Sequence, residues 1–106
     1  MKELIIDNIT YRIGENAEDN TQLINASMGT WTWFHLAAFP SCHVIVCHDN
    51  IDESMINTAA NLVKSKSKYK FRNIGVNYCL VRNLRHGTKP GSVHFSSNRQ
   101  VKKVHI

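Results

Sequence analysis

The chain has 106 residues, of which 42% are apolar and 20% are charged, and its formal net charge is +5. This length fits one domain with a single core, and the composition is that of a globular chain. No apolar run approaches the roughly 18 residues of a membrane span, and two acids, Glu3 and Asp7, interrupt any signal-peptide core. Cys42, Cys47 and Cys79 are an odd number without a C-x-x-C pair, which favours free thiols in a reducing, cytoplasmic compartment.

The charges are unevenly divided along the chain. Residues 1–59 hold all eight acids and only two bases, a net charge of −6, whereas residues 60–106 hold eleven bases and no acid, a net charge of +11. Like charges at this density repel one another and destabilise a fold unless something offsets them. A polyanion such as nucleic acid is the favoured partner, and the alternative is that the acidic half folds against the basic half.

The first thirty residues predict a hairpin and a helix. Residues 4–6 and 9–13 are β-branched runs around an Asp-Asn turn. Asn16 is a suitable N-cap for a helix over residues 17–26, which carries two acids in its first turn, where the helix dipole favours anions.

Two strands are predicted next, over residues 33–37 and 42–48, around a Phe-Pro-Ser turn. In the second of these, the period of two places His43, Ile45 and Cys47 on one face and Val44, Val46 and His48 on the other. Because both faces are partly apolar, we expect this strand to lie in the centre of a sheet.

A second helix is predicted to open on Asn50 and Glu53 as a capping pair. Its apolar stripe at helical spacing consists of Met55, Ile56, Ala59, Ala60 and Val63. A strand with alternating apolar residues follows over residues 74–81, and then a polar loop over residues 83–91. Residues 92–95 and 101–106 are predicted to form a closing hairpin. The order ββα ββ α βββ indicates an α+β fold with one mainly antiparallel β-sheet and two helices.

Metal and nucleophile sites are poorly supported by the pattern. Cys42, His43, Cys47 and His48 are ligand types that zinc accepts, but neighbours on a strand point to opposite faces, so at most half of them converge. His43 and Cys47 share a face at roughly 13 Å, beyond hydrogen-bond reach. Cys79 on another strand is the remaining partner for a histidine. We therefore predict no metal, no cofactor and no catalytic residue.

Aromatic residues near the predicted cations suggest another chemistry. Trp31, Trp33 and His35 have the same strand parity, and an exposed flat ring beside cations is a pattern that stacks unpaired bases. The alternative is that Trp33 fills the core, as we expect for Phe34.

Several blocks resemble the NFACT RNA-binding domain. In order, they are Ile13-Gly14-Glu15-Asn16-Ala17-Glu18-Asp19-Asn20, Trp33-Phe34-His35, Pro40-Ser41-Cys42-His43-Val44, the Ala59-Ala60 helix, Val76-Asn77-Tyr78, and Lys89-Pro90-Gly91-Ser92-Val93. The resemblance covers residues 9–106 and implies an RNA-binding module of ribosome quality control, which engages large ribosomal subunits and tRNA. The length suggests a free-standing version of the module. The chain departs from the family pattern at Glu15, Trp31, Ser41 and Cys47.

The motif positions also have physical interpretations. The free N–H groups at the helix start beside Asn16 and Asn20 are suited to bind phosphate. His35 and His43, on neighbouring strands, would position a phosphate or sugar, or else bond backbone carbonyls within the core. In the Lys89-Pro90-Gly91 turn, the glycine permits close approach of a phosphate backbone, whereas an ordinary turn would not require the lysine.

The resulting hypothesis is a non-catalytic domain that binds tRNA or rRNA, with the large ribosomal subunit as a further partner and no membrane contact. The predicted nucleic-acid-binding residues are Arg12, Asn16, Asn20, Trp33, His35, His43, Lys64, Lys66, Lys68, Lys70, Arg72, Arg82, Arg85, Lys89, Arg99 and Lys102. The alternatives are a protein-interaction adaptor of the translation apparatus that docks through the acidic half, and a small tRNA-directed hydrolase that uses His43 and Cys79.

Overall fold

The turn between the first two strands shows how local sequence sets the fold. Asp7 and Asn8 both have positive φ, 51° and 65°, and they join Ile6 directly to Ile9 in the strand register. A two-residue hairpin turn of type I′ needs positive φ at both central positions, and Asp and Asn tolerate it better than other residues with a side chain. The predicted hairpin is confirmed as β1 (Lys2–Ile6) and β2 (Ile9–Gly14).

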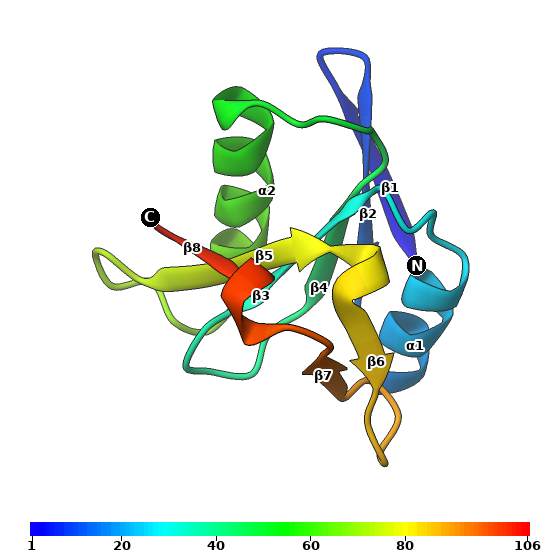
Figure 1. The fold of residues 1–106 in the computed structure, drawn as a ribbon. Coiled ribbons are helices and arrows are strands. Elements are labelled where there is room, and N and C mark those ends of the chain that lie inside the picture. The colour runs from blue at the N-terminus through cyan, green and yellow to red at the C-terminus, as the bar shows by residue number, and fades with distance from the viewer.

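The computed structural model describes residues 1–106, and Figure 1 shows its arrangement. After the hairpin come α1 (Ala17–Asn25), β3 (Thr32–Leu36), β4 (His43–Val46), α2 (Glu53–Lys66), β5 (Gly75–Leu80), a 3₁₀ turn (Val81–Asn83), β6 (Leu84–His86), β7 (Val93–Phe95), a second 3₁₀ turn (Asn98–Gln100) and β8 (Lys102–His105). The predicted α+β class, with two helices and a mainly antiparallel sheet, is confirmed. Neither helix is long and apolar enough to cross a membrane.

Six strands form one antiparallel sheet in the order β1-β2-β4-β3-β5-β8, and β6 and β7 form a separate two-stranded ribbon. The prediction that β4 is central is confirmed, since it pairs with β2 on one side and β3 on the other. All four of its residues are buried.

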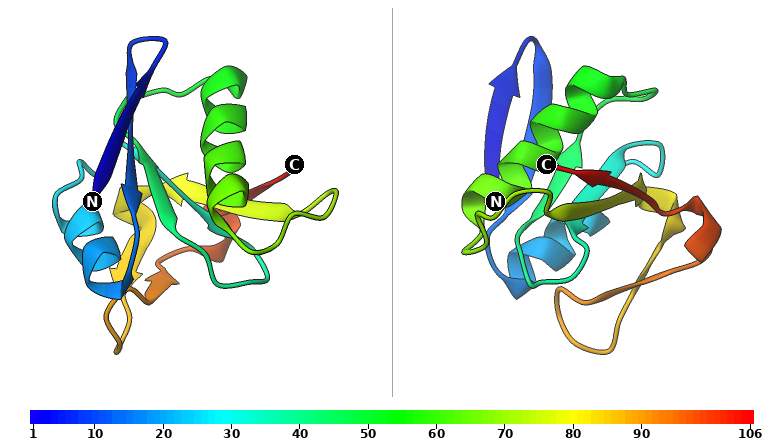
Figure 2. Two further views of the ribbon diagram at one scale, coloured as in Figure 1. Left: turned by 180° about the vertical axis from the view of Figure 1, so that it is seen from behind. Right: turned by 90° about the vertical axis from the view of Figure 1, so that its left-hand side faces the viewer.

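The two faces of the sheet are covered by different elements, as the two views of Figure 2 show. Helix α2 packs on one face, over a core that includes Phe34, Val44 and Val63. Helix α1 and the β6–β7 ribbon lie on the other face, over a smaller core that includes Leu23 and Trp33. We call these the α2 face and the α1 face.

The C-terminal strands pair differently from the prediction. The closing hairpin is wrong, because β7 pairs with β6 and β8 pairs with β5 at the edge of the large sheet. The predicted loop over residues 83–91 contains β6, a strand of three residues in which only Leu84 is buried. Such a short, exposed strand has no apolar alternation to reveal it.

The cap of α2 also differs from the prediction. The Asp52 side chain accepts a hydrogen bond from the Met55 N–H at 2.9 Å, so Asp52 is the N-cap. Asn50 lies two residues earlier, in the loop, with φ of 55°. An N-cap residue has extended backbone, which Asp52 adopts and Asn50 does not.

Candidate nucleic-acid interface

The cations of the basic half are not neutralised within the molecule. The two ion pairs of the structure join the Met1 amino group to Asp19 at 2.8 Å and Arg12 to Glu3 at 2.7 Å. Both lie within residues 1–59, so none of the eleven cations of residues 60–106 forms a salt bridge. Direct pairing of the acidic half with the basic half, the alternative to a polyanion partner, does not occur.

The predicted cations around the end of α2 divide into two kinds. Lys70 Nζ donates to the carbonyls of Ser65 and Ser67, and Lys64 Nζ donates to the Ile106 carbonyl, so these two side chains satisfy carbonyls near the helix C-terminus and chain end. The side chains of Lys66, Lys68 and Arg72 are exposed and make no hydrogen bond within the protein. These three cations are free to meet an anion.

An aromatic cluster lies among these cations. Phe39 stacks on Tyr69 with ring centroids 4.2 Å apart, and Phe71 meets Phe39 edge-on at 5.5 Å. Phe71 is 52% exposed, which is unusual for so large an apolar side chain beside lysines. The sequence analysis missed Tyr69 and Phe71, although the alternation Lys-Tyr-Lys-Phe-Arg over residues 68–72 was the available signal.

A second group of predicted cations lies elsewhere. Arg82, Arg99 and Lys102 line a cavity of about 810 Å³, together with Asp49 and Tyr78. The carboxylate of Asp49 in this cavity accepts a hydrogen bond from Thr30 Oγ1 at 2.5 Å. This cavity is therefore basic but contains an acid, unlike the surroundings of the aromatic cluster.

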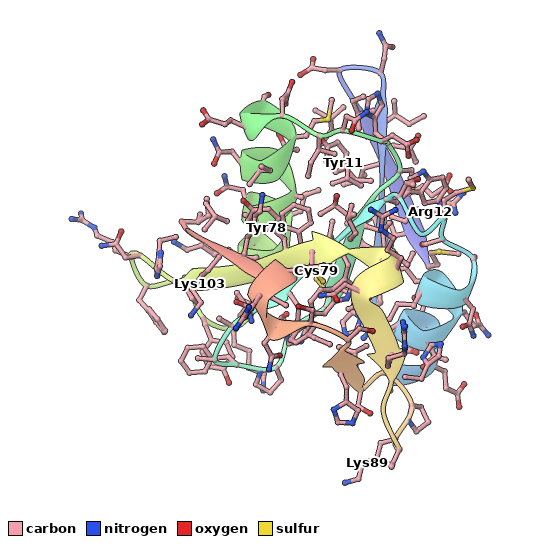
Figure 3. The ribbon with its side chains drawn as sticks, in the orientation of Figure 1. Tyr11, Arg12, Tyr78, Cys79, Lys89 and Lys103 are labelled. Carbon is pink, nitrogen blue, oxygen red and sulfur yellow. The ribbon has the colours of Figure 1, made fainter.

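The remaining predicted cations are separate from both groups. Figure 3 shows Arg12, Lys89 and Lys103 on three different sides of the molecule. Arg12 is paired with Glu3 and lies over the Trp31 ring at 5.4 Å, so its charge is already partly satisfied. Arg85 donates to the carbonyls of Arg82 and Leu84. Lys89 is exposed and its amino group has no partner.

The two asparagines at the start of α1 have structural roles. Asn16 caps the helix by accepting from the Asp19 N–H at 2.9 Å, and Asp19 accepts from the Glu15 N–H at 3.0 Å. Asn20 is buried beside Gly14, where a Cβ atom would lie 2.0 Å from Asn20 Oδ1. The first turn is thus internally capped and acidic, and phosphate binding by Asn16 and Asn20 stays a prediction that these contacts do not favour.

The glycine of the Lys89-Pro90-Gly91 turn serves a contact within the protein. Gly91 has φ of 80°, and a Cβ there would lie 2.9 Å from the Ala17 Cα. Its N–H donates to Thr21 Oγ1 at 2.8 Å. The close approach expected for a phosphate backbone is therefore made to helix α1, and Lys89 is exposed at the tip of the loop that carries this docked turn (Figure 3).

Trp33 does not present a free ring. It is 2% exposed, with His35 stacked at 5.7 Å and Phe95 edge-on at 5.7 Å. The interpretation of Trp33 as a base-stacking residue is wrong, because its ring is covered on the α1 face, and the alternative interpretation as a core residue is confirmed. Trp31 is half-buried under the Arg12 guanidinium.

A row of polar side chains crosses the uncovered end of the α1 face. The strand register places His35, Asn77 and Lys103 side by side on β3, β5 and β8, and the His43 ring on β4 lies next to the His35 ring. Their exposure rises along the row, from buried His43 through half-buried His35 and Asn77 to exposed Lys103. We call these four residues the polar row. Asn77 and Lys103 were missed in the sequence, because the pairing of distant strands cannot be read from it.

A cavity of about 370 Å³ opens over this row. His35, His43 and Asn77 form part of its lining, with Phe39 from the aromatic cluster and Ser92 from the docked turn completing its rim. Phe39 therefore belongs both to the aromatic cluster and to the cavity wall. The cluster, the cavity and the turn that carries Lys89 form one continuous surface.

The two histidines of the row are held neutral. Burial, with a smaller contribution from the neighbouring His35, lowers the pKa of His43 from its ordinary value of 6.5 to about 3. Burial also lowers the pKa of His35, although its hydrogen bond with the Leu36 carbonyl opposes the shift. At neutral pH the pair offers hydrogen bonds and carries no positive charge.

The thiols are unsuited to nucleophilic catalysis. Burial raises the pKa of the Cys79 thiol to about 11, and it also raises the pKa of Cys42 and Cys47. Strand β3 lies between Cys79 on β5 and His43 on β4, which separates them by roughly 10 Å at the usual strand spacing. No three His, Cys, Asp or Glu side chains converge as metal ligands.

Comparison with known proteins adds to this geometry. Residues 5–97 match the NFACT protein RNA binding domain, whereas a search of curated proteins gives no match. Among solved structures, the fold is similar to the C-terminal part of the fibronectin/fibrinogen-binding protein from Streptococcus suis, with a TM-score of 0.86 and 24% identity over 98% of this chain and 43% of that chain. This chain thus spans less than half of that structure, and at this identity the likeness shows the fold alone. Since the family match covers most of its length, the chain belongs to the NFACT RNA-binding domain family.

Proposed function

We propose that this protein binds tRNA or rRNA in the cytoplasm and acts at the large ribosomal subunit without catalysing a reaction. The observation that carries the proposal is that eleven cations of residues 60–106 form no salt bridge with any of the eight acids. A folded surface with this excess of free positive charge is stabilised by a polyanion. Membership of the family supports RNA as that polyanion.

The contacts favour the α1 face as the RNA surface. There, Lys103 lies opposite Asn77, which lines the cavity, and Phe39 of the aromatic cluster forms part of the cavity rim. Lys68 and Arg72 flank the other rings of that cluster along the chain. Exposed aromatic rings stack on unpaired bases while neighbouring cations contact the phosphates. The cavity of Arg82, Arg99 and Lys102 lacks an exposed aromatic ring of this kind and contains Asp49. RNA with unpaired nucleotides is therefore the favoured ligand.

Two adjacent lysines of β8 provide the test. Lys102 and Lys103 have the same charge and are both exposed, but Lys102 lies opposite Tyr78 on the α2 face and Lys103 lies opposite Asn77 on the α1 face. Affinity for a fluorescent single-stranded RNA is measured by anisotropy for Lys103→Ala and for Lys102→Ala. We expect Lys103→Ala to weaken binding several-fold more than Lys102→Ala. If Lys102→Ala weakens binding more than Lys103→Ala, the RNA lies instead at the cavity lined by Arg82, Arg99 and Lys102.

The salt dependence of the same assay tests the electrostatic basis. For Z phosphate contacts with a single strand, the logarithm of the binding constant falls with the logarithm of salt concentration at about −0.7Z. We expect a slope of a few units. Affinity that does not depend on salt, or no RNA binding at low salt, would overturn the proposal.

The identity of the RNA needs an experiment in cells. Crosslinking followed by sequencing of the bound RNA should recover tRNA or large-subunit rRNA. Recovery of ribosomal proteins without crosslinked RNA would instead favour the adaptor function. The Lys103→Ala variant is the matched control, because it should lose crosslinks to RNA and keep any protein contact that the acidic half makes.

A further inference from the structure

The hydrogen bonds of the two buried histidines determine which nitrogen of each ring carries the proton. The Trp33 indole N–H can only donate, and it lies 3.1 Å from His43 Nδ1, so His43 Nδ1 accepts. The Leu36 carbonyl can only accept, and it lies 2.6 Å from His35 Nδ1, so His35 Nδ1 donates. In a neutral imidazole one nitrogen is a donor and the other an acceptor. His43 therefore presents Nε2–H, and His35 presents a bare Nε2.

These two Nε2 atoms have no hydrogen-bond partner within the protein. The only buried side-chain polar atom without a partner is Asn20 Oδ1, which lies beside Gly14, so neither Nε2 is sealed inside the core. His43 is only 3% exposed, yet both histidines line the cavity of about 370 Å³. The ring centroids are 5.1 Å apart, at an interplanar angle of 89°. The cavity thus contains one donor and one acceptor side by side.

A neutral donor and a neutral acceptor on two adjacent rings match a hydroxyl group, which is itself both donor and acceptor. They match a phosphate poorly, because a phosphate oxygen only accepts and would meet the bare His35 Nε2. The positive charge that a phosphate needs is supplied by Lys103 at the exposed end of the polar row, two strands away from His35. The side-chain amide of Asn77, with its donors and acceptor, lies between them.

We infer that the His35–His43 pair binds a ribose hydroxyl of one ribonucleotide whose phosphate lies toward Lys103, and that this cavity makes the protein select RNA over DNA. The inference rests on the proposed function, since it concerns the sugar of the same bound strand. The 2′-hydroxyl is the group that allows a protein to distinguish the two nucleic acids at one site. A cavity of this volume accommodates a sugar with part of its base.

The test compares strands that differ only in this hydroxyl. Anisotropy is measured with an unstructured oligouridine and with the matching oligodeoxyuridine, at one low salt concentration. We expect the protein to bind the RNA about tenfold more tightly, the factor that one or two net hydrogen bonds provide. Equal binding of both strands would overturn the inference and leave the proposed function intact, whereas failure to bind either strand would remove the proposed function.

Variants locate the preference. His35→Phe keeps the ring that stacks on Trp33 and removes the acceptor, so the RNA-to-DNA ratio should fall to about one, with DNA affinity unchanged. Lys103→Ala is the control, since it should weaken both strands equally and preserve the ratio. His43→Leu removes the donor; if it does not fold, as shown by its circular dichroism, the half-buried His35 decides the test. A wild-type ratio in His35→Phe would overturn the inference.

A pH series separates the hydroxyl site from a cationic phosphate site. The ionisable groups nearest the cavity are His35 and His43 themselves, with Lys103 beyond Asn77, and no carboxylate lines it. Because burial lowers the pKa of both rings, the RNA-to-DNA ratio should stay constant as the pH falls from 8 through 6.5, the ordinary pKa of a histidine. If affinity for both strands rises several-fold below pH 6.5 in the wild type and not in His35→Phe, the pair binds phosphate as a cation and the inference is wrong.

Discussion

The two faces of the sheet bury their side chains to different degrees, although the same strands form both. On the α2 face, Phe34, Val44 and Val76 are fully buried beneath a helix of fourteen residues. On the α1 face, a helix of nine residues and a short ribbon cover Trp33 and Ile45 but leave the polar row at one end. The degree of coverage is therefore what distinguishes the face that only forms core from the face that we propose to bind RNA. Because successive side chains of a strand point to opposite faces, each strand contributes residues to both faces.

Trp33 and Phe34 test this comparison most strongly, because they are neighbours on β3 that point to opposite faces. Each is buried, so replacement by Ala should cost about 3–5 kcal/mol of unfolding free energy. Urea denaturation measures both losses. RNA affinity of the folded fraction should fall only for Trp33→Ala, because His43 loses the N–H that orients it. If Trp33→Ala keeps the stability of the parent but binds RNA more weakly, Trp33 stacks on a base and is not a core residue.

Acid should destabilise the α1 face through His43. Its pKa is about 3 when folded and about 6.5 when unfolded, so the unfolded chain binds more protons in this window. Stability is complete above pH 6.5 and falls as pH drops toward 3, by about 2 kcal/mol at pH 5 from His43 alone. The lowered pKa of His35 acts in the same direction. Thermal melts from pH 7.5 to pH 5 should show this loss, and His43→Leu should flatten the profile.

Phe71 tests whether the binding surface extends to the rim of the sheet. If Phe71 stacks on a base, Phe71→Ala should cost about 1–3 kcal/mol of RNA binding. The melting temperature should change little, because the ring is 52% exposed. Ile5→Ala is a matched control, since Ile5 is 71% exposed on β1, on the far side of the sheet order from β8. Equal affinities of the two variants would exclude Phe71 from the interface.

The smallest change in stability is expected for the double variant Arg85→Ala and Lys89→Ala. Both side chains are exposed on the β6–β7 ribbon and its turn, so the free energy of unfolding should change by at most ~0.5 kcal/mol. Affinity for RNA should fall for all sequences alike, and the salt slope should flatten by about one unit for each phosphate that the variant no longer binds. If this double variant binds like the parent, the docked turn lies outside the interface.

Sequence periodicity was sufficient for the two helices and for most of the strands, including the faces of individual strands, but not for the short strand β6. The alternation of His43, Val44, Ile45 and Val46 placed each of them on its observed face, and the Asp-Asn turn determined the first hairpin. Strand partners were not accessible in this way, because β5 and β8 pair across more than twenty residues that contain another two-stranded ribbon. The C-terminal hairpin was therefore wrong.

The candidate site was predictable to a different extent. The unequal distribution of charge and the histidines were visible in the sequence, and so was the basic-aromatic segment that was overlooked. The polar row was not, because its four residues come from four strands and only the register joins them. Asn16 and Asn20 show the converse case, since these two motif residues cap the helix and pack beside Gly14 in this structure, while their phosphate binding stays a prediction.

The lysines of β8 also affect how the protein behaves when no RNA is bound. β8 is an edge strand, and its outer backbone groups are unpaired in the six-stranded sheet. Exposed edges invite other chains to add as further strands, and lysine side chains oppose such pairing by repulsion and by their hydration. Lys102 and Lys103 thus keep the edge from self-association. Removing both charges at once should promote aggregation in proportion to protein concentration, so single substitutions at low concentration are the appropriate probes of binding.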